Sequence, residues 1–311
     1  MSAEVVGRPL LLAPTPREWL DTHLEQHVAV LGAAGADDDR TWVAAQLLLA
    51  DDAAVLRAAH ARILADGGTP QMAAKWLVAW TAGKTADLVG FVLATGGAGL
   101  LAGTGRLRWR LHPDGWVDRA SLAGCTVLVA EGHPWAGQDG VEVAADEAEV
   151  DSRTVDSLVR AVRPVVDAIR GLARVGARSM WAEVADGIGL STTYQPHLPV
   201  RGDVLPRLRS ALTAPGSPWR VSPTLRTATA PWGQVYVGQK GGCCLAYHRP
   251  DTSEAVPEAD LTPAMREYLA LFPRETGSAR VCSTCSLRDA QGCTDRQLWW
   301  LRHQRPDAAG A

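Results

Sequence analysis

Five of the six cysteines lie in the last 70 residues of this 311-residue chain, and no other feature constrains its fold and chemistry as strongly. Cys243 and Cys244 are adjacent, and after 37 further residues Cys282 and Cys285 form a C-x-x-C motif. Six cysteines in a chain of this length do not make a disulfide scaffold. In a reducing compartment, a cluster of this kind predicts a metal site before it predicts disulfides.

The spacing of the four thiols bears on the kind of metal. A C-x-x-C turn brings two thiolates to one metal, whereas successive side chains of an extended segment point opposite ways. The vicinal pair therefore binds one ion well only if the chain turns there, and Gly241 and Gly242 are expected to supply that freedom. Four thiolates suit structural zinc or a 2Fe–2S cluster. The vicinal half favours the cluster modestly, and zinc stays open.

Two segments resemble the end of FhuF-type ferric-siderophore reductases, which carry Cys-Cys, a spacer and Cys-x-x-Cys around a 2Fe–2S cluster. They are GGCCLAYHRP at 241–250 and VCSTCSLRD at 281–289, and SMWAEVADGI at 179–188 resembles the Trp-containing helix upstream. The spacer of 37 residues is longer than is typical of the family. The free energy of loop closure grows only logarithmically with length, so an insertion is tolerable.

The resemblance implies both a ligand set and an activity. The implied cluster ligands are Cys243, Cys244, Cys282 and Cys285. The implied activity is that of an oxidoreductase, which adds one electron to a ferric siderophore, with the hydroxamate type favoured. Oxygen ligands that hold hard Fe³⁺ hold the softer Fe²⁺ less well, so one electron releases the iron. Without a credible nucleotide site, the donor is expected to be a protein such as a ferredoxin, and the location cytoplasmic.

Other side chains near the cysteines are candidates for tuning such a centre. Cys293 is expected to be a buried or spare thiol at the start of the last helix, although its spacing also allows an alternative ligand. The basic or ionisable groups that could offset the cluster charge or meet an anionic chelate are Lys240, His248, Arg249 and Arg288.

Two rival functions stay open from the sequence. In one, four cysteines hold zinc and stabilise a siderophore- or protein-binding protein without redox activity. In the other, the protein is a ferredoxin-like electron carrier with another client. Iron and acid-labile sulfide would exclude the first, and reoxidation by ferric hydroxamates would argue against the second.

Charge and hydropathy exclude two classes of partner. The 31 Lys and Arg against 34 Asp and Glu give a net charge of −3, which offers no basic footprint for nucleic acid or an anionic membrane. The longest uncharged stretch, 88–105, contains six glycines and is expected to be a buried helix running into a Gly-rich turn rather than a membrane span.

The hydrophobic periodicity predicts an α+β protein with a mainly helical N-terminal and central region. We expect a siderophore-binding part over 1–240, with a possible sub-boundary near 146–151, and a small Cys-rich 2Fe–2S module over 241–311. Strands at 106–112, 116–122 and 125–130 are predicted to form an antiparallel meander, with another possible at 141–143. Helices are predicted at 15–31, 42–49, 53–64, from Thr69-Pro70 onward, 85–94, from Asp151 or Ser152 to 175, 179–186, 203–212, 262–272 and 294–303.

Overall fold

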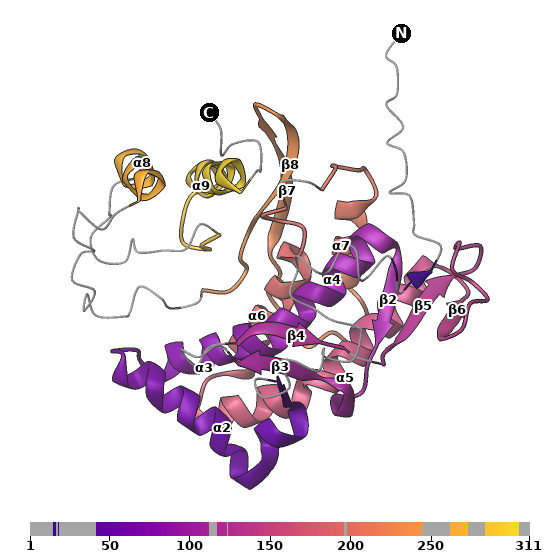
Figure 1. Cartoon of the computed structure of the whole chain (residues 1–311), viewed down its shortest axis with the longest axis horizontal. Coiled ribbons are helices and arrows are strands. Elements are labelled where there is room, and N and C mark those ends of the chain that lie inside the picture. The colour runs from indigo at the N-terminus through magenta and orange to yellow at the C-terminus, as the bar shows by residue number, and fades with distance from the viewer. Residues whose placement is uncertain are drawn as a thin grey trace.

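The computed structural model describes residues 15, 16, 18, 42–111, 117–122, 124–195, 198–243, 245, 262–272 and 284–304. It confirms the α+β class, with helices predominating over small sheets (Figure 1). The helices are α2 (Ala45–Ala65), α3 (Pro70–Val78), the π-helical turn η1 (Ala79–Gly83), α4 (Lys84–Gly96), the 3₁₀ turn η2 (Thr104–Arg106), α5 (Glu147–Ala173), α6 (Ala177–Leu190), α7 (Val204–Leu212), α8 (Pro263–Leu271) and α9 (Ala290–His303). The strands are β1 (Trp42–Ala44), β2 (Ala98–Leu101), β3 (Arg108–Leu111), β4 (Val117–Ser121), β5 (Thr126–Ala130), β6 (Val141–Ala144), β7 (Thr224–Ala230) and β8 (Gly233–Gln239).

Predicted helix starts are visible as side-chain caps. The Thr69 hydroxyl accepts the Met72 N–H at 3.2 Å, and Pro70 is the first residue of α3. The Thr15 hydroxyl likewise accepts the Glu18 N–H at 3.2 Å, whereas the rest of the helix predicted up to Leu31 lies outside the described residues. Helix α5 begins earlier than predicted because Asp146, rather than Asp151 or Ser152, accepts the amide of its first turn.

The first described segment differs from the prediction of a helix over 42–49. Its first three residues form β1, which pairs antiparallel with β3, so that Val43 lies opposite Trp109. Pairing with a distant strand has overridden the local helical pattern there. The helical residues that follow are interrupted at Ala50–Ala53, close to the predicted break between two helices, and the second part ends before Gly67, as predicted.

The predicted meander is only half present. Strands β3 and β4 form the expected antiparallel hairpin, but β5 joins a second sheet of order β2-β5-β6, in which β5 and β6 run parallel. The partner that draws β5 away is β2, in a segment predicted to be a turn. A Cβ at Gly99 would come within 1.8 Å of the Thr154 hydroxyl, so glycine alone lets β2 lie against α5.

The core is built around the continuous helical run of α3, η1 and α4. This run, 70–96, is long and apolar enough to cross a bilayer, but 78% of its most apolar window is buried inside the molecule. The structure therefore places it as a core helix of the fold. Gly90 lies so close to α6 that a Cβ on it would be 2.4 Å from the Ile188 carbonyl oxygen. In the same interface, a Cβ on Gly187 of α6 would be 2.3 Å from the Gly83 carbonyl oxygen.

The C-terminal elements share a small core of their own. Ala230 and Val235 of the β7–β8 hairpin, with Val237, pack against Leu301 of α9. Figure 1 shows the hairpin beside α9, with α8 on the far side of α9. This contact joins residues on both sides of position 240, while the division into 1–240 and 241–311 stays a prediction.

Candidate metal centre

The end of strand β8 holds the two cysteine segments together. The Lys240 N–H donates to the Thr284 carbonyl at 2.7 Å, and the Gln239 side-chain amide donates to the Cys285 carbonyl at 2.9 Å. Cys243 follows Lys240 by three residues, a span of at most about 11 Å, and Cys285 follows Thr284 directly. The two cysteine segments, although separated by 37 residues in the sequence, therefore both lie next to the end of β8.

A buried glutamine fixes this arrangement from behind. Gln297 of α9 is fully buried; its side-chain oxygen accepts the Gly238 N–H at 2.9 Å and its amide donates to the Gly238 carbonyl at 2.7 Å. The same amide donates to the Cys293 carbonyl at 3.1 Å. Because buried polar groups are costly when they lose their partners, this glutamine locks β8 and α9 in one register.

The sulfurs of the two predicted ligands that the structure describes each accept a hydrogen bond from the backbone N–H of the residue two positions later. The Leu245 N–H donates to Cys243 Sγ at 3.4 Å, and the Leu287 N–H donates to Cys285 Sγ at 3.3 Å. Leu245 has φ of +61°, a left-handed conformation that is uncommon for a residue with a side chain. Amide donors favour the thiolate over the thiol and raise the potential of sulfur-bound iron. The two sulfurs thus share one kind of hydrogen-bond donor, which suits metal thiolates.

The four predicted ligands are only partly described. Cys243 is half-buried and Cys285 is buried, while Cys244, Cys282 and two of the candidate flanking groups, His248 and Arg249, lie outside the described residues. Among the residues that the structure describes, no three His, Cys, Asp or Glu side chains gather as a metal site. The residues that are described fit a thiolate-bound group: two sulfurs with amide donors, on two segments tied to each other.

The roles of Gly241 and Gly242 differ from the prediction. Neither has positive φ, so the freedom of a left-handed turn is not what requires glycine. Space requires it instead: a Cβ at Gly241 would lie 2.6 Å from the Ser222 carbonyl oxygen, and one at Gly242 would lie 2.8 Å from the Ala182 Cβ. The backbone before Cys243 is pressed between α6 and the residues before β7.

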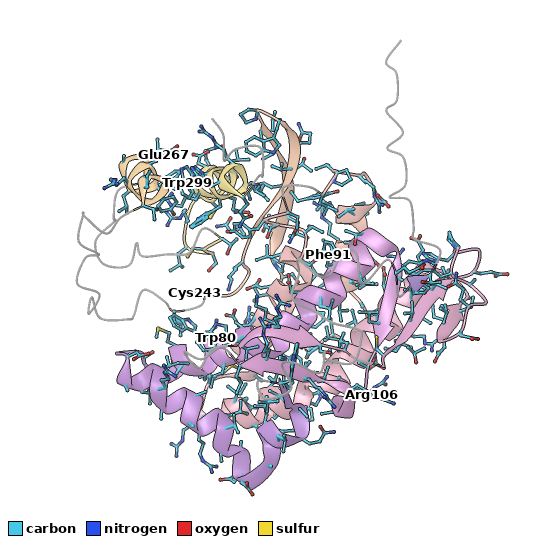
Figure 2. The ribbon with its side chains drawn as sticks, viewed as in Figure 1. Trp80, Phe91, Arg106, Cys243, Glu267 and Trp299 are labelled. Atoms are coloured by element: carbon cyan, nitrogen blue, oxygen red, sulfur yellow. The ribbon has the colours of Figure 1, made fainter. Side chains whose placement is uncertain are left out.

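Four ionisable side chains surround this glycine turn: Lys75, Glu183, Lys240 and Asp186. Lys75 of α3 and Glu183 of α6 form an ion pair of 2.9 Å, with side chains only 2% and 1% exposed, and Lys240 reaches the other Glu183 oxygen at 3.3 Å. The Lys75 ammonium also donates to the Cys243 carbonyl. Figure 2 shows Cys243 between the end of β8 and the helical run that carries Trp80.

Asp186, one turn after Glu183 on α6, completes the support. Its carboxylate oxygens accept the N–H groups of Gly241 and Gly242 at 2.7 and 3.3 Å. Burial, followed by the nearby Glu183 charge, raises the pKa of Asp186 to about 7, against the lowering effects of Lys240 and the two amides. The turn is therefore held by hydrogen bonds to a carboxyl group that titrates near neutral pH.

The other flanking groups and cysteines that the structure describes have different surroundings. Lys240 is bound to Glu183, as described above, and the Arg288 backbone carbonyl accepts the Gln239 amide at 2.6 Å. Cys293 is the buried thiol that the sequence predicted, and its sulfur donates to the Cys285 carbonyl at 3.3 Å. Cys125 packs against the main core, and burial raises the pKa of its thiol to about 12.

Sequence reasoning missed the supporting residues Lys75, Glu183, Asp186, Gln239 and Gln297. One signal was available: Glu183 and Asp186 are three apart in a stretch of α6 that is otherwise apolar from Met180 onward, so they share a face that must meet polar groups if it is buried. Nothing in the sequence indicates that Lys75, more than 160 positions upstream of Cys243, faces the same turn.

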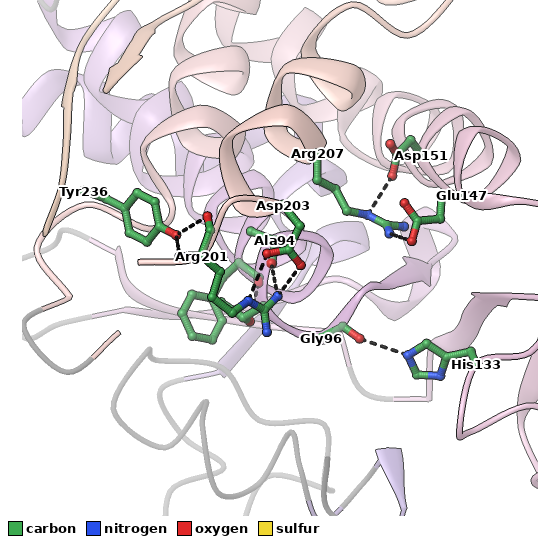
Figure 3. Close-up of polar contacts among 11 residues, drawn as sticks. Ala94, Gly96, His133, Glu147, Asp151, Arg201, Asp203, Arg207 and Tyr236 are labelled. Atoms are coloured by element: carbon green, nitrogen blue, oxygen red, sulfur yellow. Dashed lines mark hydrogen bonds and ion pairs between the residues drawn. The ribbon is translucent and has the colours of Figure 1, made fainter. Parts of the chain in front are cut away.

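A second polar cluster caps the C-terminal end of α4 (Figure 3). The carbonyls of Ala94 and Gly96 accept from Arg201 at 3.3 Å and from His133 Nε2 at 3.0 Å. His133 Nδ1 accepts the Trp135 N–H at 3.1 Å, so both contacts require the neutral ring, and burial lowers the His133 pKa below 6.5.

This histidine predicts a pH dependence of stability. Below about pH 6.5 the unfolded chain binds a proton that the folded chain resists, so the free energy of unfolding falls as the pH falls. One such proton contributes at most about 1.4 kcal/mol per pH unit. Denaturant unfolding from pH 8 to 5 should show this fall in the native protein relative to His133→Gln. Parallel curves for the two proteins would contradict it.

Comparisons of the chain with protein-family models, with curated proteins and with solved structures found no match in any of the three. The resemblance to ferric-siderophore reductases therefore stays a prediction from the cysteine segments and the α6 sequence.

Proposed function

We propose that this protein is a cytoplasmic ferric-siderophore reductase that uses a 2Fe–2S cluster bound by Cys243, Cys244, Cys282 and Cys285. The observation that carries the proposal is the shared geometry of Cys243 and Cys285. Each sulfur accepts a hydrogen bond from the backbone N–H of the residue two positions later. The end of β8 holds the two segments together through hydrogen bonds of 2.7 and 2.9 Å.

When bound, such a cluster supplies single electrons at a potential adjusted by hydrogen bonds to sulfur and by nearby charge. The residues around it have separate tasks. The Leu245 and Leu287 amides stabilise negative charge on the sulfurs. Gln297 and Gln239 keep the two segments at a fixed separation, which limits reorganisation when the charge of the centre changes.

Zinc remains the rival occupant, because four thiolates also suit structural zinc. The vicinal cysteine pair supports iron over zinc, whereas the amide donors to sulfur suit either metal. Metal and sulfide analysis decides between the two metals. One zinc per chain in a colourless protein would support a binding protein without redox activity and would contradict the reductase.

The reaction itself is tested by reoxidation. Protein reduced under anaerobic conditions and freed of reductant should be reoxidised by a ferric hydroxamate siderophore, releasing one Fe²⁺ per reduced cluster to a ferrous-specific chelator. The gallium complex of the same siderophore has the same charge but accepts no electron, and should cause no reoxidation. A cluster that stays reduced with the ferric complex would make the protein an electron carrier for another client.

A further inference from the structure

The Lys75–Glu183 pair is the most deeply buried ion pair among the described residues, and it lies against the cysteine centre. Its side chains come from α3 and α6, and α6 also packs against β8, where a Cβ on Gly238 would lie 2.3 Å from a Leu190 methyl carbon. Removing two charges from water costs several kcal/mol per ion, and apolar replacements of such pairs are often neutral or stabilising. Stability alone therefore does not account for a pair in this position.

The contacts of the pair point to the first cysteine segment. Lys75 donates to the Cys243 carbonyl, and a Cβ on Gly242 would lie 3.6 Å from its ammonium nitrogen. Glu183 in turn binds Lys240, the residue whose N–H donates to Thr284 beside Cys285. The pair thus contacts the Cys243 backbone after the glycine turn and the Lys240 side chain before it, and through Lys240 it is linked to the second segment.

We infer that Lys75 and Glu183 are positioning residues that fix the Cys243 segment and, with opposite signs, set the reduction potential of the centre. This inference rests on the proposed function, because it assumes that the centre is redox-active. An electron added to the cluster is a negative charge. A fixed cation nearby stabilises the reduced form and a fixed anion destabilises it, and both effects are strong where water is excluded.

The test uses two single variants of the full-length protein. Lys75→Met removes the cation and leaves Glu183 paired with Lys240, while Glu183→Gln removes the anion and keeps a side chain that can hydrogen-bond. Redox titration followed by EPR should show that Lys75→Met lowers the ratio of reduced to oxidised protein at fixed potential by about tenfold, or 59 mV for one electron. Glu183→Gln should raise that ratio.

The opposite signs separate electrostatics from damage, because a merely structural role would disturb both variants in the same direction. Arg207 and Asp151 supply the matched control: they form a buried pair of 3.2 Å between α7 and α5, with side chains 8% and 4% exposed. Arg207→Met and Asp151→Asn should destabilise the fold and leave the potential unchanged.

The outcomes distinguish this inference from the proposed function. A wild-type protein without a 2Fe–2S signal overturns both. A wild-type cluster whose potential is unchanged in the variants, or moves the same way in both, overturns the inference alone. If the Lys75→Met protein does not bind the cluster, the Glu183→Gln protein decides. A higher ratio of reduced to oxidised protein at fixed potential supports the inference, and an unchanged or lower ratio overturns it.

Discussion

Cys285→Ser is expected to abolish the iron–sulfur centre and with it the reduction of ferric siderophores. Cys285 Sγ is buried and accepts the Leu287 amide, so a serine oxygen there is a poorer ligand in a site organised for sulfur. Loss of residues that only support metal ligands costs about 10- to 100-fold in metal affinity or activity, and loss of a ligand should cost at least as much. Iron, acid-labile sulfide and visible absorbance, measured on anaerobically purified protein, report the change.

Cys293 provides the matched control, since it lies eight residues further on and is also buried. Its sulfur donates to the Cys285 carbonyl, a contact that a serine hydroxyl can replace. Cys293→Ser should therefore retain iron, sulfide and activity close to those of the native protein. Equal loss in both variants would mean that Cys293 is needed for the centre as much as Cys285, and would contradict the predicted set of four ligands.

Gly242→Ala is expected to produce the second-largest effect. The new methyl group would lie 2.8 Å from the Ala182 Cβ, closer than carbon atoms pack, so the backbone before Cys243 or helix α6 must move. Overpacking of this kind costs about 1–3 kcal/mol, and here the displacement falls one residue from a predicted ligand. Cluster content should fall severalfold, measured as iron and sulfide per chain. Gly103→Ala is the control, because φ there is −86° and a Cβ would meet nothing within 4 Å.

A second substitution, Ala182→Gly, tests whether this clash, rather than any side chain at position 242, causes the loss of the cluster. Ala182→Gly removes the atom that the new methyl group meets, and the next contacts, with Asp186 and Lys75, are at ordinary distances of 3.5 and 3.6 Å. The Ala182→Gly, Gly242→Ala protein should regain most of its cluster. Its free energy of unfolding should still be lower by roughly 1 kcal/mol, because glycine is unfavourable within a helix. A double variant no better than Gly242→Ala would show that the clash is not the cause.

Local signals predicted the fold best where the chain itself decides the structure. Thr69-Pro70 begins α3, and Gly67 follows the end of α2, because capping and left-handed φ act within one turn. Predictions failed where distant segments decide: β2 was predicted to be a turn, and it became a strand because Gly99 can lie against Thr154 and pair with β5. That contact spans 55 residues and has no local signal.

The same division applies to the candidate centre. Thiol chemistry and spacing identified the four cysteines, since metal-binding residue types are visible in the sequence. The glycines before Cys243 were also identified, but for the wrong reason: packing against Ala182 and Ser222 requires them, and no pattern near them reveals it. Lys75 could not be found at all, because its relation to Cys243 exists only after α3 and β8 have packed.

The most direct test of the central claim is an EPR spectrum of the anaerobically purified, dithionite-reduced protein, with iron and acid-labile sulfide measured on the same sample. A 2Fe–2S centre predicts two irons and two sulfides per chain and a reduced-state signal close to one spin per chain. A colourless protein with zinc, or with no metal and no signal after reconstitution with iron and sulfide, would contradict the account.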